Sequence, residues 1–131
     1  MEPQSYVLVY APNGMGEKFI HLLENRGIPF AALVNCSSLR ERMENLRINQ
    51  IIQVDTKNHS KWVVPEIAVG SIYLFENSVS ACCRYIQICR QWTTEPIYVI
   101  TQSTHPRMIY KGLGANHVLY TNNDHVSFLL S

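Results

Sequence analysis

The stretch Tyr6-Val-Leu-Val-Tyr-Ala-Pro-Asn-Gly-Met-Gly16 decides which fold this 131-residue sequence predicts. Residues 6–11 form a nearly continuous apolar run, which is typical of a strand that is covered on both faces. From Met15 to Leu23 the apolar residues recur at helical spacing, and Asn25-Arg26-Gly27 provides a helix end. The stretch therefore predicts a buried central strand, a turn that contains glycine, and a helix.

The rest of the chain repeats this alternation. Further strands are expected at residues 30–34, 51–54, 71–75, 96–100 and 118–120, and further helices at 39–43, 81–92 and 106–111. Ser37-Ser38 is the expected N-cap of the second helix, and residues 56–66 should connect two strands with at most one turn of helix. Because strands alternate with helices, we expect βαβ units with right-handed crossovers, and therefore an α/β fold. It is a Rossmann-like, doubly wound, mainly parallel six-stranded sheet with helices on both faces, in one domain spanning residues 1–131.

The composition excludes several classes of protein. With 47% hydrophobic residues, 16% charged residues and a net charge of +1, the chain lacks both the composition of a disordered protein and the positive field that attracts nucleic acid. Residues 1–5 carry no positive side chain, and the apolar run that follows is too short for a signal peptide or a membrane span. We therefore expect a cytoplasmic protein that binds no nucleic acid and does not insert into the membrane.

The cysteines point to packing rather than to metal or disulfide chemistry. Cys36, Cys82, Cys83 and Cys89 form no CxxC pair and match no histidine spacing typical of metal sites. Free cysteine usually behaves as a small hydrophobic residue. We expect reduced thiols in or near the core, with a redox sensor as the alternative, and no metal site.

The turn after the first strand is a degraded form of the dinucleotide-binding motif G-x-G-x-x-G. Aligned by spacing, the three glycine positions hold Ala11, Asn13 and Gly16, so only the glycine that lets the helix pack against the strand is present. The Asn13 side chain stands where phosphate oxygens would lie, although Gly14 is expected to relieve the turn. Free N–H groups of Gly14, Met15 and Gly16 would still hold an anion at the helix N-terminus. The alternative is a turn without a ligand.

The second strand ends without the acidic residue that holds the ribose of NAD. Its place is taken by Asn35, followed by Cys36-Ser37-Ser38. Asn35 can hydrogen-bond a ribose, and the two serine hydroxyls with Arg40 can meet a 2′-phosphate. A helix cap followed by a solvated helix face explains the same residues. Together with the missing glycines, this absence argues against the usual mode of NAD binding.

Two further polar clusters follow strands. Asp55 ends the third strand and Glu76 ends the fourth, so both would border the same crevice in a doubly wound sheet. Each also suits a cap or a turn. The five histidines are scattered, and neither a nucleophile elbow nor a P-loop lysine is present. We therefore expect no catalytic residue.

With this order of elements, the sequence resembles the TrkA-N or RCK nucleotide-binding domain, a cytoplasmic regulator of potassium channels and transporters. Four segments carry the resemblance: residues 6–16, 50–57, 71–78 and 112–119. It implies a non-catalytic regulatory domain that senses an adenine nucleotide or dinucleotide, forms a homodimer or higher homo-oligomer, and controls a membrane cation channel or transporter. The nucleotide contacts that it implies are at Asn13, Gly14, Met15, Gly16, Asn35, Asp55 and Glu76.

Three other classes of protein share features with this sequence. A response-regulator receiver domain needs paired acids after the first strand, where this chain has Pro12-Asn13. A minimal NAD(P)-dependent reductase needs a tyrosine and a lysine on one face, but Tyr110 and Lys111 are adjacent and therefore diverge on a helix. A protein-interaction module with an inert cleft is not separated from a nucleotide sensor by sequence.

Overall fold

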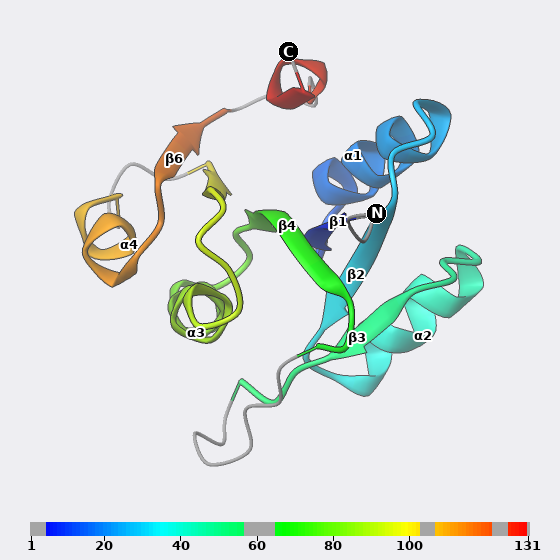
Figure 1. Cartoon of the computed structure of the whole chain (residues 1–131), viewed down its shortest axis with the longest axis horizontal. Coiled ribbons are helices and arrows are strands. Elements are labelled where there is room, and N and C mark those ends of the chain that lie inside the picture. Colours follow the sequence, from blue (N-terminus) through cyan, green and yellow to red (C-terminus); the bar gives the residue numbers. More distant parts are fainter. Residues whose placement is uncertain (1–4, 57–64, 103–106, 122–125, 131) are drawn as a thin grey trace.

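A computed structural model describes residues 5–56, 65–102, 107–121 and 126–130 (Figure 1). Six strands form one sheet in the order β3-β2-β1-β4-β5-β6, and every pairing is parallel. The strands are β1 (Ser5–Tyr10), β2 (Phe30–Val34), β3 (Ile51–Gln53), β4 (Ala68–Phe75), β5 (Ile97–Thr101) and β6 (His117–Tyr120). The helices are α1 (Gly14–Asn25), α2 (Ser37–Asn45), α3 (Val79–Arg90), α4 (Arg107–Leu113) and the 3-10 helix η2 (Ser127–Leu130). The predicted Rossmann-like sheet is confirmed.

Alternate residues of the central strand face two separate cores. Leu8 and Tyr10 pack with the residues under α3 and α4, whereas Val9 and Ala11 pack with the residues under α1, α2 and η2. All four of these side chains are almost fully buried, which explains why the sequence shows a continuous apolar run. Helices therefore cover both faces of the sheet (Figure 1).

Most element ends agree with the sequence expectation. Gly27 adopts a φ of 66° directly after α1, and the Ile28 N–H donates to the Leu23 carbonyl, so Asn25-Arg26-Gly27 closes the helix as predicted. Strand β4 begins at Ala68, three residues before the predicted start. Its pairing with β1 is irregular between Tyr6 and Leu8, a local disturbance that periodicity does not reveal.

Two local predictions are wrong. Helix α2 already begins at Ser37, so the residue at its N-cap is Cys36, whose side chain makes no capping hydrogen bond. The prediction that all four thiols lie in or near the core also fails for Cys36, which is exposed. Cys82 and Cys89 are buried, as expected, and burial raises the pKa of Cys82 to about 12. Most of the predicted connection at residues 56–66 lies outside the described residues.

No helix among the described residues is long and apolar enough to cross a membrane.

Strand order reverses between β1 and β4. The chain runs outward from β1 through β2 to β3, then returns to the other side of β1 and runs outward again through β5 to β6. The loops that follow β1 and β4 therefore diverge, and open α/β sheets bind ligands in the crevice formed there, beyond the carboxyl ends of the strands.

Candidate functional site at the carboxyl edge of the sheet

A cavity of about 580 Å³ lies at this crossover point, and we call it the cleft. Its volume falls within the range of small-molecule sites. Residues at or just after the ends of β1, β2, β3 and β4 line it, together with residues of α1, α2 and α3. The lining residues are Tyr10, Pro12, Glu17, Asn35, Cys36, Ser38, Leu39, Arg42, Thr56, Asn77, Ser78 and Ala81.

Asn13 ties the turn after β1 to the protein itself. It is the N-cap of α1, with extended backbone, and its Oδ1 accepts a hydrogen bond from the Gly16 N–H at 3.0 Å. Its Nδ2 donates to the main-chain carbonyl of Glu76 at 3.4 Å, across the crossover point. The predicted free N–H of Gly16 is therefore wrong, because the asparagine side chain already satisfies it.

The two glycines of this turn have different roles. A Cβ on Gly16 would lie 2.7 Å from both Cα and Cβ of Ala11, so its predicted role in helix-to-strand packing is confirmed. A Cβ on Gly14 would meet nothing within 4 Å, and Gly14 is not among the residues with positive φ. The expectation that Gly14 relieves a strained turn is therefore wrong. Met15 is buried in the core under α1.

Neutral polar groups gather at the end of β2. Asn35 lines the cleft, and its Nδ2 donates to Oγ1 of Thr56, which follows β3, at 3.5 Å. Burial raises the pKa of Tyr10 at the end of β1, and a side-chain hydrogen bond with Asn35 opposes part of the rise. This wall offers amide and hydroxyl groups of the kind that hydrogen-bond a ribose.

An ion pair links α1 and α2 at the cleft. Nε and Nη2 of Arg42 donate to the two carboxylate oxygens of Glu17 at 3.0 and 2.8 Å. Arg42 lowers the pKa of Glu17 through this hydrogen-bonded contact. Arg40, one of the groups considered for a 2′-phosphate, donates to Glu44 and Gln53 in exposed hydrogen bonds, and among the described residues the cation that lines the cleft is Arg42.

Glu76 and Asp55 do not line the cleft. The Glu76 carboxylate accepts hydrogen bonds from the hydroxyl of Thr101, at 2.7 Å, and from that of Tyr110. Asp55 is exposed beyond β3. Nor does Glu76 cap α3, because Ser78 is the N-cap and its Oγ accepts from the Ala81 N–H at 3.2 Å. Of the seven predicted contact residues, only Asn35 lines the cleft, and the structure joins Asn13 to the main chain of Glu76.

Sequence reasoning missed Tyr10, Glu17 and Arg42. Two of them carry a usable signal, because Glu17 lies four residues after Asn13 and Arg42 lies four residues after Ser38. Positions i and i+4 share a helix face, so Glu17 lies on the same face as the N-cap Asn13, and Arg42 on the same face as Ser38. Extending the search by one helical turn would have found both.

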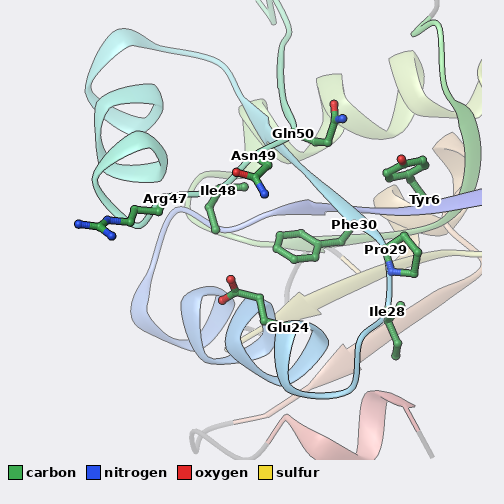
Figure 2. Close-up of a pocket in the computed structure, with 9 residues that line it drawn as sticks. All are labelled: Tyr6, Glu24, Ile28, Pro29, Phe30, Arg47, Ile48, Asn49 and Gln50. Carbon is green, nitrogen blue, oxygen red and sulfur yellow. The ribbon is translucent and has the colours of Figure 1, made fainter.

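A second cavity, of about 320 Å³, lies at the opposite edge of the sheet, near the start of β1, β2 and β3 (Figure 2). Figure 2 shows the Phe30 ring beside Pro29, with the Arg47 side chain pointing away from it. Arg47 has a φ of 62°, in the left-handed region that favours glycine. Because ligands of doubly wound sheets bind at the carboxyl ends of the strands, the candidate site is the cleft.

No family model and no curated protein matches the sequence. By structure, the chain is similar to the NAD(P)-binding domain of an exopolyphosphatase-related protein from Archaeoglobus fulgidus. The TM-score is 0.71 and the identity 15%, over 89% of this chain and 88% of that one. It is also similar to the TrkA-N domain of the inner membrane protein ybaL from Escherichia coli, with a TM-score of 0.69 and 12% identity over 92% of this chain and 90% of that one.

A further structural relative is the GsuK channel, which has been solved with NAD and with ADP. Its NAD-bound structure has a TM-score of 0.71 and 16% identity to this chain, which matches over 90% of its own length but covers 22% of the channel. At these identities the likeness shows the fold. The predicted resemblance to the Rossmann domains of the TrkA-N and RCK type is thereby confirmed at the level of fold.

Proposed function

We propose that this protein is a regulatory, non-catalytic domain that binds an adenine nucleotide in the cleft and controls a cation channel or transporter with which it assembles. The observation that carries the proposal is the cleft itself, at the point where strand order reverses. This is where doubly wound sheets bind nucleotides. The GsuK structures with NAD and ADP support the choice of an adenine ligand.

The end of β2 supports the nucleoside half of the ligand. In this fold the ribose lies beside the last residue of the second strand, where the chain has Asn35 with Thr56 beside it. Ser38 and Leu39 extend the same wall with a hydroxyl and an apolar side chain. The wall thus combines a few hydrogen-bonding groups with apolar surface, as small-molecule sites usually do.

The exposed face of α4 supports assembly with a second polypeptide. Met108 and Ile109 are adjacent on this helix and are 84% and 56% exposed. Tyr120 at the end of β6 and Phe128 in η2 are also large exposed apolar residues. Exposed apolar side chains of this size are typical of protein contacts when they cluster. We propose that α4 contributes to a homodimer or to a contact with the channel.

Calorimetric titration tests the ligand, and a cysteine of the cleft provides an independent readout. Cys36 is exposed and lines the cleft, whereas Cys89 is buried. We expect a thiol reagent to label Cys36 first and saturating adenine nucleotide to slow this labelling. Cys36→Ser identifies the fast thiol. The proposal fails if adenosine, AMP, ADP and NAD give neither heat nor protection.

A second candidate is a protein-interaction module with an inert cleft. The hydrogen bond from the Gly16 N–H to Asn13 favours this candidate, because it uses a donor that would otherwise face a phosphate. For this candidate, sedimentation would show an oligomer that no adenine compound alters, and Met108→Glu would dissociate it. For the first candidate, nucleotide would protect Cys36 whatever the oligomeric state.

A further inference from the structure

The cleft has two chemically different ends. At the end of β2 it offers the uncharged groups of Asn35, Ser38 and Thr56. At the N-terminus of α1, where a dinucleotide places its pyrophosphate, Pro12 and the Glu17 carboxylate line the cleft, and Asn13 caps the helix between them in sequence. The first end suits a nucleoside, whereas the groups at the second end determine whether a phosphate can bind there.

Asn13 fills the position that a pyrophosphate needs. The second glycine of the dinucleotide motif is a glycine because any side chain there keeps phosphate away from the backbone. Asn13 is held in this position at both ends of its amide, by the Gly16 N–H at 3.0 Å and by the Glu76 carbonyl at 3.4 Å. A phosphate would have to displace the side chain and break both hydrogen bonds.

The charge of Glu17 opposes a pyrophosphate at the same place. Glu17 lies in the first turn of α1, lines the cleft, and is 19% exposed. The cation that lines the cleft, Arg42, is already engaged by both oxygens of this carboxylate. The pair adds no net positive charge, so among the described residues that line the cleft no second cation offsets the carboxylate that two adjacent phosphates would meet.

We infer that the cleft takes an adenine ligand without a pyrophosphate, namely a nucleoside or a nucleoside monophosphate, and that Glu17 excludes diphosphates and dinucleotides. This inference rests on the proposed function. The nucleoside lies against Asn35 and Thr56, and Glu17 holds Arg42 away from a second phosphate. In this respect the chain differs from GsuK, which has been solved with ADP and NAD.

The test is a calorimetric titration of the wild-type protein with adenosine, AMP, ADP and NAD at one ionic strength. We expect adenosine or AMP to bind about tenfold more tightly than ADP and NAD, since the second phosphate of a pyrophosphate must displace the Asn13 side chain and lie near the Glu17 carboxylate. Glu17→Gln should tighten ADP and NAD by about five- to tenfold and leave adenosine unchanged, because it removes that charge and releases Arg42. Adding Asn13→Gly to this variant should tighten NAD further.

Glu44→Gln is the matched control. Glu44 lies on α2, pairs with Arg40 at 3.2 Å, is 58% exposed and does not line the cleft. It changes the net charge by the same amount at a different place, so it should leave the order of affinities unchanged. A general effect of net charge would move both variants equally.

The outcomes separate the two proposals. If none of the four compounds binds the wild-type protein, the proposed function is wrong and the inference falls with it. If ADP or NAD binds the wild-type protein as tightly as AMP, the inference is wrong and the proposed function stands. It is also wrong if Glu17→Gln shifts all four affinities alike or if Glu44→Gln reproduces its effect.

Discussion

The two sides of the crossover point use the carboxyl edge of the sheet differently. On the β1–β2 side, amide, hydroxyl and charged groups line the cleft. On the β4–β5 side, the Glu76 carboxylate turns into the protein and accepts hydrogen bonds from Thr101 and Tyr110. Doubly wound folds are built from two mononucleotide-binding halves. The first half lines the cleft with amide, hydroxyl and charged groups, whereas the second half adds Asn77 and Ser78 but directs its carboxylate toward Tyr110 of α4.

This difference bears on the size of the ligand. A dinucleotide would span both halves, and the second half offers Asn77 and Ser78 but not the Glu76 carboxylate, which already has partners within the protein. A ligand confined to the first half needs nothing from Glu76. The contrast between the halves therefore agrees with the inference that the cleft takes a ligand smaller than NAD.

The largest expected effect is on the first half and comes from Gly16→Ala. The new Cβ would lie 2.7 Å from the main chain of Ala11, so α1 must move away from β1. We expect a loss of about 3 kcal/mol in the free energy of unfolding, at the upper end of overpacking costs. Urea denaturation measures it. Gly14→Ala is the control and should be neutral or stabilising by up to about 1 kcal/mol, because its Cβ meets open space at a helical position.

The next largest effect is expected in the second half, at the hydrogen bond between Tyr110 and Glu76. Tyr110 is fully buried and its hydroxyl donates to the Glu76 carboxylate, so Tyr110→Phe removes one partner of a charged group. We expect a loss of about 2 kcal/mol, as for hydrogen bonds to charged groups. Tyr120→Phe, at a residue 47% exposed, should change stability by a few tenths of a kcal/mol. Equal midpoints for the two variants in urea would show that the Glu76 contact contributes nothing.

A third substitution separates packing from hydrogen bonding. Tyr85 is fully buried against Tyr10, with ring centroids 4.4 Å apart, and its hydroxyl has no hydrogen-bond partner among the described residues. Tyr85→Phe keeps the ring and removes the unsatisfied group, so we expect stability to be unchanged or to rise by up to about 1 kcal/mol. Thermal denaturation monitored by circular dichroism measures it. A loss as large as that of Tyr110→Phe would contradict this interpretation.

The smallest effect is the pH dependence of the ion pair at the cleft. Arg42 lowers the pKa of Glu17 below its ordinary value of 4.5, so the folded state binds this proton less readily than the unfolded state. The pair's contribution is complete above that ordinary value and is lost as the pH falls through the lowered folded-state pKa. The stability difference between wild type and Glu17→Gln should therefore shrink between about pH 6 and pH 3. A difference that stays constant over this range would show that the pair is not coupled to folding.

The sequence predicted the sheet well because the relevant signals are local. Strand and helix periods, the glycine at Gly27 and the continuous apolar run of β1 each follow from neighbouring residues. The predicted contact residues shared one weakness, because being near the end of a strand does not fix the direction of a side chain. Glu76 turned inward toward Tyr110, a residue 34 positions away, and no local pattern encodes that contact.

The cleft itself was harder to predict for the same reason. Glu17 and Arg42 are separated by 25 positions and meet only because α1 and α2 pack side by side on one face of the sheet. The sequence predicts Asn13 as an obstacle to phosphate, but the hydrogen bond that holds its side chain depends on a rotamer. Distant pairing and side-chain direction are the two properties that periodicity leaves open.

The contact between Gly16 and Ala11 shows that the glycines of this motif meet separate requirements, one for packing and others for the turn and the ligand. Gly16 is required by the distance between a helix and a strand, whatever the protein binds. The first motif position serves the tight turn and the second serves the approach of a pyrophosphate, and here they hold Ala11 and Asn13. A motif search that gives all three glycines equal weight will therefore score this chain as a weakened NAD site. Scored separately, the same residues describe an intact helix-to-strand contact beside a position that lacks the glycine of the pyrophosphate site.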